Sequence, residues 1–399
     1  MWLAAILAFG ILTLWVPDRW ALSAFQVALF AAAAVRIVQR RSLTLPFGGW
    51  MIAAAAGWGV LQVAAGWSID RVTTLDAALN WVTNLSAFML AADLYRNRDK
   101  RELFLRATLI FATILAVVSI FTFLTSPGGK VFWIFDSGSE SRTLGPFVYQ
   151  NQYATFVEAV LPLAILGMMI DRPRWALHAV AIAPLFGSVM TGGSRTGTIL
   201  CLAEILIIPA IAFGRGMING KMLARVVLGS LAAVVVLTGV VGWKPLWKRL
   251  QEPHPYSLRK DLALSSLAMV RDRPLTGFGL GTWPEAYPAY TRFDDGTYVN
   301  QAHNDWLQWA AEGGLLFLAA MLAIAGWSVG PALRSLWGVG ILGVWLHALI
   351  DYPMQQRPAL AAFFFALLGT LAASGDSWAA GRARSRKAVP VRRAIAADS

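Results

Sequence analysis

A glycine pair interrupts one apolar stretch of the chain, and the residues after it are typical of an anion-binding helix start. Residues 191–197 read Thr-Gly-Gly-Ser-Arg-Thr-Gly. Ser194 is a favourable N-cap, and the first backbone N–H groups of the helix it begins have no partner within that helix. With Arg195 beside them, these groups favour an anion, above all a phosphate. The alternative is that Arg195 only reaches a lipid head group.

A histidine is expected just outside a second helix start. Residues 301–308 read Gln-Ala-His-Asn-Asp-Trp-Leu-Gln, in which Asn304 can cap a helix and Asp305 suits its first turn. His303 is thereby held at the membrane surface, where a neutral imidazole can take a proton from a hydroxyl group. The alternative is a histidine satisfied by loop hydrogen bonds. Glu312 lies about half a revolution round the helix from its start, so we do not expect it to orient His303.

Arg259 opens a third stretch of interest, which ends at Pro274. Within it, apolar residues recur at helical spacing, which predicts an amphipathic helix lying on the membrane surface. These residues are Ala263, Leu264, Leu267 and Val270.

Patterns for metal or cofactor chemistry are weak. Cys201 is the only cysteine, which excludes an intrachain disulfide and a cysteine-based metal site, and no Asp-x-Asp pair is present. Gly277, Gly279 and Gly281 resemble a dinucleotide loop, but no βαβ pattern surrounds them, so a tight turn is the better interpretation. The histidines show no zinc-ligand spacing: His178, His254, His303 and His347. We therefore expect neither a metal nor a cofactor.

The elements that must position these residues are membrane helices. Hydrophobic residues make up 57% of the 399 residues and charged residues only 14%, whereas a soluble protein has roughly 25% charged residues. The apolar runs are about 17–23 residues long, enough to span a bilayer as helices. We predict an all-α integral membrane protein with about twelve transmembrane helices. The runs are 2–17, 20–38, 47–66, 75–94, 103–125, 149–170, 175–191, 196–213, 225–243, 305–326, 335–350 and 358–374.

Lys and Arg are distributed unevenly between the two sides of this bundle. One side receives the basic clusters of 36–41, 96–106, 172–174 and 215–225, together with Arg334 and the tail after 381. The short segments of the other side hold only isolated basic residues: Arg19, Arg71, Lys130, Arg142, Arg195 and Arg357. The positive-inside rule therefore places both termini in the cytoplasm, and the long loop 244–304 translocates largely regardless of its charge. The basic tail suits anionic lipid better than nucleic acid.

This topology divides the chain into four parts. Residues 1–243 hold the first nine helices, and 244–304 form one long outer loop with a surface helix. Residues 305–374 hold the last three helices, and 375–399 form a basic cytoplasmic tail.

Four segments on the outer side, taken in order, resemble the O-antigen ligase and O-antigen polymerase superfamily. They are 142–152 (Arg-Thr-Leu-Gly-Pro-Phe-Val-Tyr-Gln-Asn-Gln), 194–197 (Ser-Arg-Thr-Gly), Arg259 with 274–281 (Pro-Leu-Thr-Gly-Phe-Gly-Leu-Gly), and 303–314 (His-Asn-Asp-Trp-Leu-Gln-Trp-Ala-Ala-Glu-Gly-Gly). No single segment is specific, but their order and spacing make the match strong over residues 140–315.

The resemblance implies a fold, a reaction and a set of roles. Members are metal-independent inner-membrane glycosyltransferases of the GT-C type, which move a glycan from undecaprenyl diphosphate to an acceptor sugar on the periplasmic side. Arg195 and Arg259 would bind the donor diphosphate, with Arg142 matching a further motif arginine. His303 would act as or assist the base on the acceptor hydroxyl. The implied partners are an undecaprenyl-diphosphate-linked glycan, an acceptor glycolipid or growing glycan, and membrane lipids, but no nucleic acid.

Residues 347–357 depart from the ligase pattern. They read His-Ala-Leu-Ile-Asp-Tyr-Pro-Met-Gln-Gln-Arg, and similar stretches occur in some polymer-forming members. His347 and Asp351 would lie one helical turn apart on one face. We therefore treat His347, Asp351 and Arg357 as candidates for the acceptor side.

Three functions stay open from the sequence. The first is a ligase that moves a lipid-linked polysaccharide onto lipid A–core. The second is a polymerase for O-antigen, capsule or exopolysaccharide. The third is a transporter or flippase, in which the intramembrane Glu158 and Glu204 would couple an ion. The sequence lacks the internal repeat of transporter halves, which favours glycosyl transfer.

Overall fold

The apolar runs of the sequence form the helices of the structure. The computed structural model describes residues 2–40, 44–241, 257–292 and 298–387, together with Trp247, Gln251 and Gly296. Its helices are α1 (Trp2–Leu12), α2 (Arg19–Gln39), α3 (Phe47–Ala64), α4 (Arg71–Leu94), α5 (Arg98–Thr125), α6 (Gln150–Ile170), α7 (Trp175–Gly192), α8 (Arg195–Gly214), α9 (Gly220–Val241), α11 (Ser257–Asp272), α12 (Trp283–Ala286), α13 (Asp305–Ser335), α14 (Val339–His347) and α15 (Pro358–Lys387). Two short 3₁₀ helices, η1 (Arg172–Arg174) and η2 (Tyr287–Ala289), and one antiparallel hairpin, β1 (Lys130–Val131) with β2 (Phe135–Asp136), complete the described elements.

The chain is an all-α membrane protein, as predicted. Seven of the described helices are long and apolar enough to cross a membrane by length and composition: α2, α3, α5, α6, α7, α8 and α13. Two of the twelve predicted runs form short helices. The run 335–350 contains only the nine-residue α14, which is about 14 Å long and too short to cross a hydrocarbon core of about 30 Å. The eleven-residue α1 is also short.

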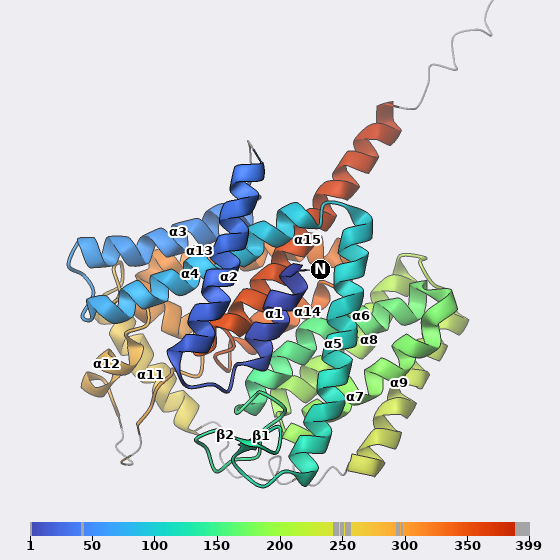
Figure 1. The fold of residues 1–399 in the computed structure, drawn as a ribbon, viewed down its shortest axis with the longest axis horizontal. Helices are drawn as coiled ribbons and strands as arrows, with labels where there is room; N and C mark the ends of the chain where they lie inside the picture. The colour runs from blue at the N-terminus through green and yellow to red at the C-terminus, as the bar shows by residue number, and fades with distance from the viewer. Residues whose placement is uncertain are drawn as a thin grey trace, which may run out of the picture.

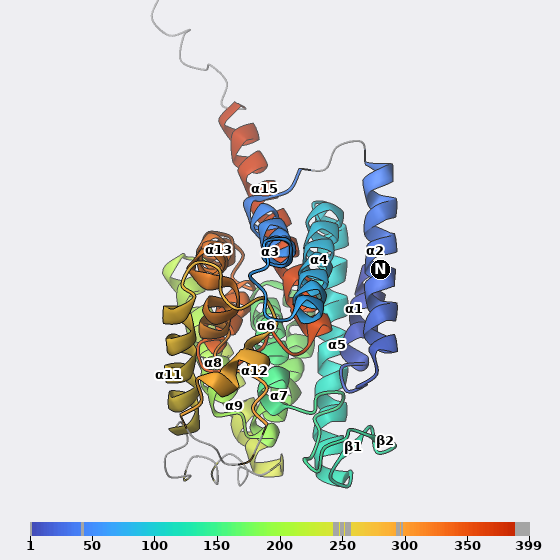
Figure 2. The same ribbon diagram turned by 90° about the vertical axis from the view of Figure 1, so that its left-hand side faces the viewer.

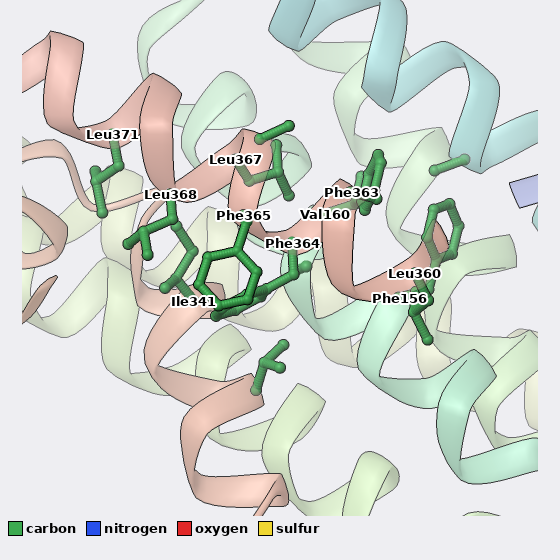
Figure 3. Close-up of a cluster of buried hydrophobic side chains, with 14 of the residues drawn as sticks. Phe156, Val160, Ile341, Leu360, Phe363, Phe364, Phe365, Leu367, Leu368 and Leu371 are labelled. Atoms are coloured by element: carbon green, nitrogen blue, oxygen red, sulfur yellow. The ribbon is translucent and has the colours of Figure 1, made fainter. Parts of the chain in front are cut away.

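Helix α15 forms the centre of the bundle. Every residue from 359 to 373 is buried, because this stretch is apolar on all sides and other helices surround it. Figure 3 shows its phenylalanine and leucine side chains packed with Phe156 and Val160 of α6 and with Ile341 of α14. The short α14 is thereby fixed between α6 and α15, and the turn between α14 and α15 is held in place.

Two predicted helix caps are present. Gly193 ends α7 in the left-handed conformation (φ 73°), which glycine adopts without steric cost. The hydroxyl of Ser194 then accepts a hydrogen bond from the Gly197 N–H (3.2 Å) and caps α8. Asn304 caps α13 in the same way, accepting from the Leu307 N–H (3.0 Å). The residues before each cap are therefore held at defined positions.

Helix α11 forms where it was predicted, but its buried face is different. Leu262 and Met269 are fully buried, whereas the predicted face includes Leu267, which is 40% exposed. The buried face packs against α13 and against Trp283, whose indole N–H donates to the Ser266 hydroxyl (3.0 Å). Apolar spacing alone could not select this face, because the partner surface comes from residues distant in the sequence.

The glycine-rich segment 277–281 forms a tight turn against α13. Gly277 has φ 66°, and a Cβ there would lie 2.2 Å from the Glu312 carbonyl oxygen. The Glu312 carboxylate accepts hydrogen bonds from the Gly281 and Trp283 N–H groups (2.9 and 3.3 Å). From α3, the Gln62 amide donates to the Glu312 carbonyl (2.8 Å). The turn is thus filled by protein, in agreement with the tight-turn interpretation.

The two ends of the bundle carry different elements. The β1–β2 hairpin and one end of α11 lie at the bottom of Figures 1 and 2, and the C-terminal ends of α2 and α15 lie at the top. The loop predicted over 244–304 contains α11, α12 and η2 rather than a single surface helix. The segment predicted as a tail from 375 continues α15 to Lys387, and Arg392 and Arg393 lie outside the described residues.

We expect the hairpin end to face the outside of the membrane. Single cysteines at Asp136, Asp295 and Ser399, each in a Cys201→Ala background, can be probed with an impermeant maleimide in intact spheroplasts. Asp136 lies on the exposed hairpin, whereas Asp295 and Ser399 lie outside the described residues. From the predicted topology, the first two positions should react and the third should not. Labelling of position 399 without lysis would contradict this topology.

Candidate active site

Asp351, in the turn between α14 and α15, is the centre of a buried polar cluster. Its Oδ2 atom accepts hydrogen bonds from the Tyr149 hydroxyl (3.0 Å), from the Asn151 amide and from Nη2 of Arg259 (3.2 Å). Its Oδ1 atom lies 3.7 Å from Nδ1 of His303. The Asp351 side chain is only 2% exposed. A carboxylate this deeply buried needs such donors and charges around it.

The cluster keeps Asp351 ionised. Burial raises the pKa of this carboxyl group, but the His303 side chain and the positive charge of Arg259 act in the opposite direction. These opposing effects prevail, so the pKa of Asp351 lies below its ordinary value. A fixed negative charge therefore faces His303 at neutral pH.

His303 is held in a sparsely populated backbone conformation. Its φ is 52°, a value rare for residues other than glycine and found at constrained sites. The residues next to it explain the constraint. The Gln308 side chain accepts from the Ala302 N–H (3.0 Å) and donates to the Gln301 side chain (2.7 Å). The His303 ring, on a side chain that is 22% exposed, meets Tyr352 edge-on, with 4.7 Å between ring centroids.

Asp305 joins the start of α13 to the turn that carries Asp351. Its N–H donates to the carbonyls of Ala348 (2.9 Å) and Asp351 (3.1 Å). Its carboxylate accepts from the Met354 N–H (3.0 Å). Because His303 and Asp351 belong to these two bonded segments, their relative position is fixed by backbone contacts.

Arg259 reaches the cluster from the first turn of α11. It donates through Nη1 to the Ile350 carbonyl (2.6 Å) and through Nη2 to Asp351. The sequence predicted a contact with a donor diphosphate and did not anticipate this ion pair. A guanidinium carries five N–H donors, so binding Asp351 does not use all of its hydrogen-bonding capacity.

Arg195 begins α8 beside the first turns of α6. A Cβ added to Gly197 would lie 2.4 Å from the Cβ of Ala154 in α6, so the two backbones approach closely. That part of α6 also holds Asn151, which binds Asp351. Helices α6, α11 and α13 begin at the cluster, and α8 begins beside α6. The positive ends of these helix dipoles therefore gather here, which favours an anion.

Arg142 makes its contacts elsewhere. Its Nη1 donates to the Phe123 carbonyl at the end of α5 (2.7 Å), and its guanidinium lies 5.8 Å from the centroid of the Phe123 ring. Among the described residues, the Arg142 side chain makes no other hydrogen bond, ion pair or cation–π contact. Arg142 therefore does not contact Asp351.

His347 lies behind the cluster rather than at an accessible surface. Its Nδ1 is 2.7 Å from Oε1 of Glu158 in α6, and both side chains are fully buried. Helix α14 comes this close because it carries glycine where it meets α6: a Cβ on Gly340 would lie 2.2 Å from the Glu158 carbonyl oxygen. The Asp351 N–H donates to the His347 carbonyl (3.0 Å). The pair is therefore suited to positioning Asp351, not to direct contact with an acceptor.

Glu204 of α8 is the second intramembrane acid considered for ion coupling. It is buried, and its carboxylate oxygens have no hydrogen-bond partner among the described residues. A Cβ on Gly343 of α14 would lie 2.9 Å from Glu204 Oε1, so this acid faces the same short helix. Within the described ranges, no three His, Cys, Asp or Glu side chains gather closely enough to hold a metal ion.

Tyr149, Asn151 and Tyr352 are candidate site residues that the sequence did not predict. The first two contact Asp351 directly, and the Tyr149 and Tyr352 rings stack with 5.3 Å between centroids. Tyr149 and Asn151 belong to the motif 142–152 and stand two residues apart at the start of an apolar helix. That placement could have singled them out.

Comparison with known proteins identifies one part of the chain. Residues 179–322 match the family model described as O-antigen ligase, which confirms the resemblance seen in the sequence. The matched stretch contains Arg195, Arg259 and His303 and ends before Asp351. A search of curated proteins finds no match to the chain.

Proposed function

We propose that this chain, whose residues 179–322 belong to the O-antigen ligase family, transfers a glycan from a lipid diphosphate donor to a sugar hydroxyl. The family match supports O-antigen ligase or polymerase function in general. The observation that carries the chemistry is the buried, ionised Asp351 between His303 and Arg259. A histidine beside a fixed carboxylate is suited to activating a hydroxyl group.

His303 is the proposed general base. A hydrogen bond from Nδ1–H to Asp351 would leave the lone pair of Nε2 for the acceptor hydroxyl. The 3.7 Å separation is long for a hydrogen bond, but such contacts often tighten when substrate binds. The acceptor oxygen then attacks the anomeric carbon while the bond from that carbon to the diphosphate oxygen breaks. The diphosphate leaves with the electron pair, and the acceptor proton passes to His303.

Arginines and helix starts supply the proposed donor site. Arg195 and Arg259 would bind the diphosphate, on which negative charge develops as it leaves. The convergent helix N-termini favour the same charge. Arg142 is a proposed third donor contact, from the segment that leads into α6.

The proposed setting is the bacterial inner membrane with a periplasmic active site. Ligation of a lipid-linked polysaccharide onto lipid A–core is the first candidate reaction. Polymerisation of an O-antigen, capsule or exopolysaccharide repeat is the second, favoured by the stretch 347–357. The acceptor side is assigned to the turn that holds Asp351, with His347 supporting it from behind and Arg357 at its end.

One experiment tests the function directly. Purified protein is incubated with undecaprenyl-diphosphate glycan, with and without lipid A–core, and the products are resolved by gel and mass spectrometry. A ligase attaches glycan to lipid A–core, whereas a polymerase lengthens the lipid-linked glycan without it. Absence of both products from folded protein would contradict glycosyl transfer.

We expect the donor arginines to require the guanidinium group itself. Arg195→Lys and Arg259→Lys keep the charge but lose the planar fork that binds phosphate bidentately. Each should lower transfer about ten- to a hundredfold, as expected for the loss of one charge-assisted hydrogen bond. Arg71→Lys, on the exposed start of α4, is the matched control. Full activity in both variants at normal protein levels would remove the proposed donor role.

A further inference from the structure

Glu312, two turns into α13, is a buried acid that the proposed reaction does not use. Its carboxylate accepts hydrogen bonds from the N–H groups of Gly281 (2.9 Å) and Trp283 (3.3 Å). A third bond comes from the side-chain amide of Gln308 (2.9 Å). Donors of this kind are what a carboxylate needs when it is removed from water, and the third of them leads toward the candidate active site.

Gln308, one turn before Glu312, connects this carboxylate to the residues before His303. Its NH₂ group donates both to Glu312 and to the Gln301 side chain (2.7 Å). Its carbonyl oxygen accepts from the Ala302 N–H (3.0 Å). A carboxylate only accepts hydrogen bonds, so Glu312 requires the NH₂ group of Gln308 on its own side. The carbonyl oxygen of the amide is thereby turned to the Ala302 N–H.

The two residues that Gln308 holds immediately precede His303 in the chain. One of them, Ala302, is itself buried. On the other side of His303, the Asn304 side chain caps α13. The left-handed backbone of His303 (φ 52°) is therefore fixed from both sides, as a sparsely populated conformation requires if it is to persist.

The other two bonds of Glu312 fix the glycine-rich turn that follows α11. Gln62 of α3 holds the same turn, because its amide donates to the Thr276 carbonyl (2.7 Å) and accepts from the Leu280 N–H (3.1 Å). The turn continues from the helix that carries Arg259. Glu312 thus joins the segment of a proposed donor residue to the loop of the proposed base.

We propose that Glu312 is a positioning residue for His303 and acts through Gln308. The inference rests on the proposed function, in which His303 takes the acceptor proton. The spacing of Glu312 and His303 along the helix argues against direct contact, and the Gln308 amide supplies an indirect one. Without the carboxylate, this amide is free to turn its NH₂ group toward the Ala302 N–H, and the loop before His303 loses its hydrogen bond.

Kinetics separate positioning of the base from support of the donor site. In Glu312→Gln and in Gln308→Met, kcat should fall about 10- to 100-fold, because a displaced base loses its alignment with the acceptor hydroxyl. The KM for the donor should stay near the wild-type value, since Arg195 and Arg259 are unchanged. Glu285→Gln, which alters an exposed acid of α12, is the matched control. A rise in the donor KM with an unchanged kcat would overturn the proposal.

Exchanging the two side chains tests whether they act as one unit. In the double variant Glu312→Gln with Gln308→Glu, the amide at position 312 can accept from the turn and donate to the carboxylate at position 308. That carboxylate can accept from the Ala302 N–H. The double variant should therefore be more active than either single variant, and it covers poor folding of those variants. Losses that simply multiply would show that the two residues act independently and would overturn the proposal.

A spectroscopic measurement separates this inference from the proposed function. The protein has four histidines, so the imidazole signals of isotope-labelled histidine can be followed by NMR in detergent micelles, with His303 assigned from His303→Gln. The His303 signal should shift or broaden in Glu312→Gln, whereas that of His178 should not move. An unchanged His303 signal would overturn the positioning role even in an inactive variant. A shifted signal in a protein that transfers no glycan would support the positioning role and contradict the proposed function alone.

Discussion

Replacing His303 by alanine is expected to lower glycan transfer by roughly 10²–10⁴-fold, the usual contribution of a general base. His303 lies on the loop before α13 and is partly exposed, so its removal leaves little cavity in the core. Donor binding should persist, because the arginines remain. The measurement is the transfer rate with equal amounts of folded protein, together with binding of the lipid donor.

Two further variants make this result specific to the base. His303→Gln keeps a hydrogen-bonding side chain but cannot accept the proton, so it should be as impaired as alanine. His178→Gln changes a histidine on α7 that lies against Asp171 (3.5 Å), away from the Asp351 cluster, and should stay close to wild type. Activity of His303→Ala within a few-fold of wild type would show that another group activates the acceptor.

Replacing Asp351 by asparagine should lower kcat about as much as His303→Ala does, on the order of 10²–10⁴-fold. The reason is that the change disturbs both His303 and the carboxylate that holds it. An amide keeps the shape of the side chain but supplies only one acceptor oxygen. In one orientation, the NH₂ group of the amide would face the groups that donate to Oδ2 of Asp351 in the wild type. In the other orientation, it would face Nδ1 of His303. Because the pKa of Asp351 lies below its ordinary value, the carboxylate is charged throughout the neutral range. The loss should therefore be nearly constant between about pH 6 and 8.

The same pKa shift predicts the sign of a stability effect. A carboxyl whose pKa is lowered by folding stabilises the protein above its unfolded pKa, and this contribution is lost as the pH falls through the folded value. Wild type should therefore lose stability relative to Asp351→Asn only under acidic conditions. Asp272→Asn, at the far end of α11 and in contact with Tyr290, is the matched control.

A loss of activity in Asp351→Asn that vanishes at one end of the neutral range would contradict the permanently charged carboxylate.

The sequence alone determined the features that depend on local chemistry. Apolar runs of membrane length predicted helices, because a chain in lipid must satisfy its backbone hydrogen bonds internally. Ser194 and Asn304 were identified as caps because their side chains bond to N–H groups only three residues away. The glycine turn at 277–281 was recognised in the same way, and the resemblance over 140–315 singled out Arg195, Arg259 and His303.

Which of these residues meet depends on how the helices pack together. Arg259 and Asp351 are ninety-two positions apart, and no local rule pairs them. The same holds for Tyr149 and Asn151, which approach Asp351 because α6 and α14 pack together. His347 and Asp351 were expected on one acceptor-facing surface, yet His347 turns to Glu158 because Gly340 lets α14 lie against α6. Periodicity specifies that a helix has an apolar face, but the partner surface decides which residues it buries. For that reason Leu267 of α11 is exposed while Met269 is buried.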